Sequence, residues 1–319
     1  MFRTMTFLVL SLPAIAAIAY YFDAPLTNEQ WAAVSAALRV YLGVALVCFV
    51  TAEITRNYSQ VDKVRTLIAV YYVWYFAAMS GWNERMVWMA TLTIVWSARL
   101  TYNLMRRGGF SWVPWGGKED YRWVALRART PAFHNRWVWG IFNLMFIALY
   151  RNALVFMFIS PIIVAWQGAT TPLGILDYLA IAGFLGFVWM QAVADNQQYR
   201  FQTQKHEHIK TGMPLNSDEA RGFLTTGLWA KMRHPNYTAE QGIWWCFYLF
   251  SVAATGRWIN WSMAGPILLM ILFVGSADYT EQLSGEKYPE YADYQKRVRR
   301  FLPNKYKTHK KHSNITQKH

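Results

Sequence analysis

The sequence predicts an all-α fold: a bundle of seven or eight transmembrane helices. Of the 319 residues, 54% are apolar and only 16% are charged. A soluble domain of this size would carry more charge and would not repeat long apolar runs. Runs long enough to cross a bilayer, or nearly so, occur at about 5–22, 31–50, 64–82, 86–105, 137–166, 173–197, 242–256 and 258–275.

The first and the seventh of these runs need separate argument. The first contains Arg3, an apolar stretch and Ala17-x-Ala19, a pattern that also fits a cleaved signal peptide. We favour an uncleaved helix because the topology requires it. The seventh is short, and we expect it to pair with the eighth as a tight helical hairpin broken at Gly256-Arg257.

Basic residues predict the orientation. Most of the 32 lysines and arginines lie near the N-terminus, in 51–65, 106–136 and 198–235, or in the tail after residue 275. The intervening loops contain only Arg85 and Arg257. The positive-inside rule therefore predicts that both termini are cytoplasmic. We expect the membrane to be a bacterial inner membrane rather than the endoplasmic reticulum. The net charge of +14 then suits anionic lipid, and we expect no nucleic-acid partner.

We expect one integral membrane domain over 1–303, with the cofactor-binding half at about 90–303, and a basic disordered tail over 304–319. Cys48 and Cys246 lie in apolar runs, so neither a disulfide framework nor a cysteine metal site is predicted. His206-x-His208 has no third ligand at a usual spacing, so we predict no metal. The oligomeric state is not readable from these patterns.

Residues 231–240 combine a helix start with polar side chains. Pro235 biases His234 away from the α region, so a helix is expected to begin directly after it. Asn236 and Tyr237 then lie in the first turn, with Glu240 about one turn further on. Free N–H groups of a first turn favour anions, and Arg233 and His234 add donors. The alternative is an ordinary helix start with a tyrosine at the lipid interface.

Two further polar clusters face the same side of the membrane. Arg99 and Tyr102 lie three residues apart, on one helical face. Because Arg99 is deep in a predicted span, it should have a carboxylate or phosphate partner. Asp195 ends a predicted span together with several amides and Tyr199; this group can bind a ribose or carboxamide, or simply join neighbouring helices.

The run Arg-His-Pro-Asn-Tyr-x-x-Glu at 233–240 resembles the C-terminal motif shared by the steroid 5α-reductase superfamily and the isoprenylcysteine carboxyl methyltransferases. The layout is most similar to the bacterial steroid-dehydrogenase-like branch of the reductases. The resemblance covers about residues 90–303. Its other pieces are Trp96-Ser-Ala-Arg99-Leu100, Ala194-Asp195-Asn-Gln-Gln-Tyr199 and Tyr288-Pro289-x-Tyr291-x-x-Tyr294.

The resemblance implies an NADPH-dependent reductase of a conjugated carbon–carbon double bond in a steroid-like or other lipophilic enone that arrives from the bilayer. It implies a cofactor site that includes Arg99, Tyr102, Asp195, Tyr199, Arg233, His234, Asn236, Glu240, Tyr291 and Arg297. The steroid reductases hold the enone carbonyl with a tyrosine, for which we take Tyr237, and with a glutamate from an N-terminal helix. No motif matches that glutamate, and Glu53 is assigned by position alone.

Two alternatives remain open. The first is a methyltransferase that uses S-adenosylmethionine on an isoprenyl or lipid substrate. The second is a non-catalytic lipid-binding membrane protein. Charged side chains buried in a membrane without function are disfavoured, which argues against the second alternative.

Overall fold

The computed structural model describes residue 15, residues 17–19 and residues 21–304. Throughout these residues the secondary structure is helical, without a β-strand. The all-α part of the predicted fold is therefore confirmed for this part of the chain. The predicted first span at 5–22 and the tail after Asn304 lie almost entirely outside the described residues.

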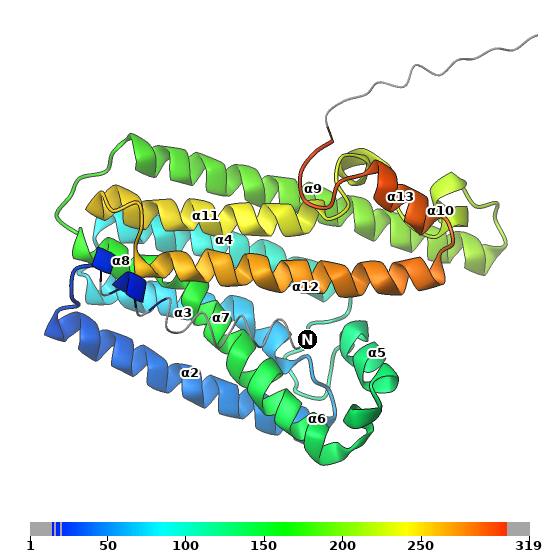
Figure 1. Cartoon of the computed structure of the whole chain (residues 1–319), viewed down its shortest axis with the longest axis horizontal. Coiled ribbons are helices and arrows are strands. Elements are labelled where there is room, and N and C mark those ends of the chain that lie inside the picture. The colour runs from blue at the N-terminus through cyan, green and yellow to red at the C-terminus, as the bar shows by residue number, and fades with distance from the viewer. Residues whose placement is uncertain (1–14, 16, 20, 305–319) are drawn as a thin grey trace, which may run out of the picture.

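Six long helices run roughly along the longest axis of the molecule (Figure 1). They are α2 (Asn28–Thr55), α3 (Gln60–Met79), α4 (Glu84–Arg106), α9 (Ile175–Thr211), α11 (Pro235–Thr255) and α12 (Ala264–Lys287). Between α4 and α9 the chain forms α5 (Tyr121–Arg129), η1 (Pro131–His134), α6 (Arg136–Phe142), η2 (Asn143–Tyr150), α7 (Arg151–Ile159) and α8 (Pro161–Gln167). Shorter elements are α10 (Ser217–Arg221), η3 (Gly227–Ala230), η4 (Trp261–Met263) and α13 (Tyr291–Arg297).

Four helical stretches among the described residues are long and apolar enough to cross a membrane: Asn28–Thr55, Arg136–Gln167, Ile175–Thr211 and Trp261–Lys287. The predicted spans at 64–82, 86–105 and 242–256 correspond to α3, α4 and α11, which have 20, 23 and 21 residues. These three helices carry charged or amide side chains at their ends, which makes them less apolar than the other four.

Helix α11 has the predicted start and end, whereas α12 begins at Ala264, several residues after the predicted start at about 258. Helix α11 begins at Pro235 after His234, and it ends at Thr255 before Gly256, whose φ is 70°. A left-handed residue of this kind is a common helix stop, and glycine adopts it without strain. The short seventh run is thus the apolar part of a longer helix whose first two turns are polar.

Close packing of α9 against α11 determines where the polar residues meet. A Cβ atom at Gly242 would lie 2.6 Å from the ring of Phe187, so only glycine allows this approach. The rings of Trp96, Phe158 and Trp244 form the adjacent core, with centroids 4.9 Å apart for Trp96–Trp244. Helices α4, α9 and α11 are therefore held together next to the polar clusters.

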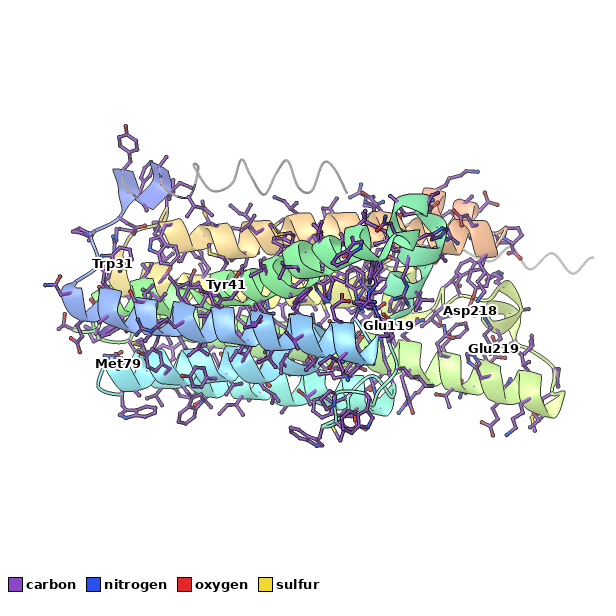
Figure 2. The ribbon with its side chains drawn as sticks, turned by 90° about the horizontal axis from the view of Figure 1, so that it is seen from below. Trp31, Tyr41, Met79, Glu119, Asp218 and Glu219 are labelled. Carbon is purple, nitrogen blue, oxygen red and sulfur yellow. The ribbon has the colours of Figure 1, made fainter. Side chains whose placement is uncertain are left out.

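The two ends of the bundle differ. One end carries α5, α10 and α13 together with the long loops, and we call it the basic end (Figure 1). Figure 2 shows Asp218 and Glu219 beyond the bundle at this end, and Trp31 and Met79 toward the other end. We call that other end, where α3 leads into α4 and α9 begins, the opposite end. The predicted polar clusters all lie toward the basic end.

Candidate functional site

Asp195 of α9 is the centre of one polar network. Its carboxylate accepts hydrogen bonds from Arg99 Nη1 at 2.6 Å, Asn103 Nδ2 at 2.9 Å and Asn236 Nδ2 at 3.3 Å. Arg107 Nη2 lies 3.4 Å from Oδ1, the carboxylate oxygen that also accepts from Asn236. The network joins α4, α9 and α11, and it supplies the acidic partner that the depth of Arg99 predicted.

Glu240 of α11 accepts hydrogen bonds from three side chains. Trp96 Nε1 lies 3.1 Å from both carboxylate oxygens, Gln191 Nε2 lies 2.7 Å from Oε2, and Trp244 Nε1 lies 3.0 Å from Oε1. Both Glu240 and Arg233 are predicted members of the cofactor site. Arg233 bonds elsewhere, and the acceptor positions of Glu240 are occupied by the protein itself.

Arg99 uses little of its hydrogen-bonding capacity. Apart from the bond to Asp195, its Nη2 lies 4.0 Å from Glu240 Oε2, beyond hydrogen-bond distance. Arg99 Nε and Nη2 are buried without a hydrogen-bond partner in the described part of the chain. Buried donors of this kind are rare in folded proteins and call for an explanation, such as a ligand.

An inner cavity of about 870 Å³ lies next to these residues. Its polar wall includes Asp195, Asn236, Tyr237 and Glu240. Much of the remaining wall is apolar and comes from α4, α7 and α12: Trp96, Leu100, Leu154, Val155, Phe158, Leu269, Leu272 and Phe273. Further charged side chains also line it: Asp62, Arg65, Arg107, Lys118, Glu119, Asp120, Arg122, Arg151 and Asp278. Small-molecule sites combine apolar walls with polar groups that converge.

A second cavity of about 880 Å³, the outer cavity, lies at the basic end. Its basic side chains are Arg107, Arg129, Arg233, His234 and Lys287. Tyr291 also lines it, and burial raises the pKa of that hydroxyl, so it is protonated at neutral pH. Asn236 and Tyr237 line both cavities. The first turn of α11 is thus part of the wall that the two cavities share, together with Arg107 and Tyr121.

Arg233 and His234 belong to a separate network around Glu281 of α12. Arg233 Nε and His234 Nε2 lie 2.8 and 2.9 Å from Glu281 Oε1, and Arg300 Nη2 lies 2.9 Å from Oε2. Arg233 Nη1 also donates to the backbone carbonyl of Val298 at 2.6 Å. These bonds fix the segment after α13 against the start of α11, so most donors of Arg233 serve the protein. That segment extends to Asn304, which we had assigned to the tail: its backbone N–H donates to the Lys231 carbonyl at 3.0 Å.

Five predicted site residues line neither cavity: Glu53, Arg99, Tyr102, Tyr199 and Arg297. Tyr102 is 63% exposed, and Arg106 stacks over both its ring and that of Tyr199. Arg297 is exposed and donates to the carbonyl of Asp293. Glu53 accepts a hydrogen bond from Asn143 at 2.9 Å, at the end of α2. The structure brings together Arg99, Asp195, Asn236, Tyr237 and Glu240, with Arg233, His234 and Tyr291 around the outer cavity.

Sequence reasoning missed a second charged pair on the wall of the inner cavity. Arg151 Nη2 lies 2.5 Å from Asp62 Oδ1, and Arg151 Nη1 lies 3.2 Å from Oδ2. Arg151 follows directly on η2, an eight-residue π-helix, a form that is rare and frequent at functional sites. The position of Arg151 inside an apolar run was the signal, but nothing in the sequence identified its partner.

The family model described as "Protein of unknown function (DUF1295)" matches residues 48–298. The chain belongs to this family. An uncharacterised protein of Schizosaccharomyces pombe, C594.04c, is 34% identical over 260 residues, which cover 78% of this chain and 73% of that protein. No solved structure matches the chain. The matched region contains every candidate site residue.

Proposed function

We propose that the protein is a membrane-embedded reductase that uses NADPH to reduce a conjugated carbon–carbon double bond in a steroid-like or other lipophilic enone. The observation that supports this most is the shared wall between the two cavities. A polar outer chamber suits a nucleotide, and a largely apolar inner chamber suits a lipophilic substrate. Asn236 and Tyr237 stand where the two molecules would meet. The steroid 5α-reductase superfamily is the parent group that we propose for the family.

The charges of the outer cavity favour NADPH among the candidate cofactors. Arg107, Arg129 and Lys287 line it, and guanidinium and ammonium groups bind phosphate oxygens. NADPH carries a pyrophosphate and an additional phosphate, whereas S-adenosylmethionine carries none. Arg129 is also paired with Glu286 at 2.5 Å, and Arg107 lies 3.4 Å from Asp195, so a phosphate would share these cations with the protein's own acids. The methyltransferase alternative makes less use of them.

NADPH would supply a hydride to the β-carbon of the enone. The protein would contribute orientation and a proton donor. The Tyr237 hydroxyl has no hydrogen-bond partner among the described residues, and its ring stacks on His234 with centroids 5.1 Å apart. It is therefore held in place and free to donate to the carbonyl oxygen of a substrate as negative charge develops there.

We also propose seven or eight spans with both termini in the cytoplasm, in a bacterial inner membrane. The basic end would then face the cytoplasm, where NADPH is available, and the apolar inner cavity would receive its substrate from the bilayer. A reporter fused after His319 should be active only in the cytoplasm. A periplasmic or lumenal reporter would remove the proposed cofactor route.

The direct test of the cofactor is thermal unfolding of the detergent-purified protein with NADPH, NADH and S-adenosylmethionine. A ligand at ~100 times its dissociation constant stabilises the folded state by about 2.7 kcal/mol. We expect the largest shift with NADPH and a smaller one with NADH. A shift with S-adenosylmethionine and none with either nicotinamide would support the methyltransferase, and no shift with any of the three would support the non-catalytic alternative.

A further inference from the structure

Arg65 on α3 is a cation on the inner cavity that the proposed reduction does not use. Its side chain lines the cavity and is 37% exposed. Within the described residues it makes no hydrogen bond, and its Nε is buried without a partner. An arginine in mostly apolar surroundings normally pairs with an acid, because an unpaired charge there is costly.

Asp62 is the acid nearest to Arg65, but it is already bound. Arg65 Nε lies 3.9 Å from Asp62 Oδ1, a distance too long for a hydrogen bond. The same carboxylate takes two hydrogen bonds from Arg151. Two guanidinium groups therefore share one carboxylate, which leaves about one positive charge in excess at this part of the wall.

Arg99 lies on the neighbouring helix α4, where Asp195 and Glu240 balance its charge. Thr66 and Thr101 are hydrogen-bonded at 2.9 Å, which places α3 and α4 side by side at this level. Arg99 does not line the inner cavity, whereas Arg65 and Arg151 do. The unused cationic donor on this wall therefore belongs to Arg65, whose Nε is buried without a partner among the described residues.

We infer that Arg65 binds an acidic group of the substrate, so that the substrate is an apolar molecule with a carboxylate or phosphate headgroup. The planar guanidinium matches the two oxygens of such a group, and the apolar wall from α4, α7 and α12 accepts the rest of the molecule. This inference rests on the proposed function for the reaction, but it concerns another lining residue of the inner cavity. Tyr237 would hold the reacting end of the same molecule.

The test uses 11-(dansylamino)undecanoic acid and its methyl ester, with the full chain in nanodiscs of phosphatidylcholine at about pH 8, where a carboxylate is ionised. Dansyl emission measures binding without NADPH, so the result does not depend on the cofactor. We expect the acid to bind at least tenfold more tightly than the ester. Arg65→Gln should remove this preference and leave ester binding unchanged, and Arg65→Lys should retain part of it.

Arg39→Gln is the matched control, because Arg39 is exposed on α2 and lines neither cavity. It should keep the full preference for the acid. Equal binding of acid and ester, or an Arg65→Gln variant that keeps the preference, would overturn the inference. Displacement of the acid by NADPH would assign Arg65 to a cofactor phosphate. Displacement by added phosphatidylglycerol would assign it to a membrane lipid. Either displacement would reject the substrate assignment, whereas a thermal shift with NADPH tests the proposed function independently.

Discussion

Helices α4 and α9 are joined by two arginine–aspartate pairs, one toward each end of the bundle, and the two differ in how far they are satisfied. At the opposite end, Arg85 donates to Asp177 at 2.7 and 3.0 Å and gives its other hydrogen bonds to backbone carbonyls of the loop before α9. Both side chains are 1% exposed. At the basic end, Arg99 donates one hydrogen bond to Asp195, and its Nε and Nη2 have no partner in the part of the chain that the structure describes.

The comparison separates a structural ion pair from one beside a ligand site. The same two residue types on the same two helices give a closed cluster where a loop supplies carbonyl acceptors. Where a cavity takes the place of that loop, donors are left over. Burial of a charged pair alone therefore does not indicate function; the number of unused donors next to a cavity is the more informative feature.

Breaking the closed pair should have the largest effect. Arg85→Met leaves Asp177 buried without its partner, which typically costs about 3–5 kcal/mol of stability. We expect a large loss of thermal stability in detergent, measured by the unfolding midpoint. Arg39→Met, at an exposed position, should change the midpoint little. If the two variants unfold alike, the pair at the opposite end does not stabilise the bundle.

At the basic end, the largest effect should be on turnover. Tyr237→Phe removes only a hydroxyl without a protein partner, so the thermal midpoint and the NADPH-induced shift should match wild type. Loss of a proton donor should lower turnover by about 100-fold. Oxidation of NADPH with candidate enones measures this. Wild-type turnover in this variant would exclude Tyr237 as the proton donor.

The helical segments and their boundaries were predictable because apolar runs and helix-stop residues are local signals. Pro235 and Gly256 mark the two ends of α11 in the sequence, and the structure uses both. The partner of Arg99 was predictable only as a class, since an acid or phosphate was required. That the acid is Asp195 depends on the packing of α9 against α4, which no local pattern contains.

Three other features required the fold. The hydrogen bonds of Glu240 come from α4, α9 and its own helix, so a motif within one segment could not identify them. Arg233 was expected at the cofactor but bonds to Glu281, nearly fifty residues away in sequence. The pairing of Asp62 with Arg151 joins α3 to the helix after a π-helical segment, and such a segment has no clear sequence signal.

Glu240→Gln is expected to have an intermediate effect on both stability and function. The new amide turns N–H groups toward Trp96, Gln191 and Trp244, which are themselves donors. A buried group left unsatisfied costs about 1–3 kcal/mol, and a displaced Gln191 or Arg99 should lower cofactor affinity or turnover about tenfold. Thermal unfolding and NADPH titration measure the two effects separately.

Glu207→Gln is the control for this variant, because Glu207 lies exposed on the polar end of α9. It should leave stability, NADPH binding and turnover unchanged. Should Glu240→Gln behave in the same way, the polar start of α11 would be an ordinary helix start. The unused donors at the basic end would then not indicate a ligand site.

The smallest expected effect distinguishes two arginines at the basic end. Arg107 lines both cavities and lies 3.4 Å from Asp195, whereas Arg297 is exposed and lines neither. Arg107→Gln removes one partly exposed phosphate contact worth about 1 kcal/mol, so the dissociation constant for NADPH should rise about fivefold. Arg297→Gln loses only a bond within α13 and should bind NADPH like wild type. The resemblance to the reductases favours Arg297, and the geometry favours Arg107. Titration of both variants decides between them, and a larger loss at Arg297 would mean that α13 moves toward the outer cavity when the cofactor binds.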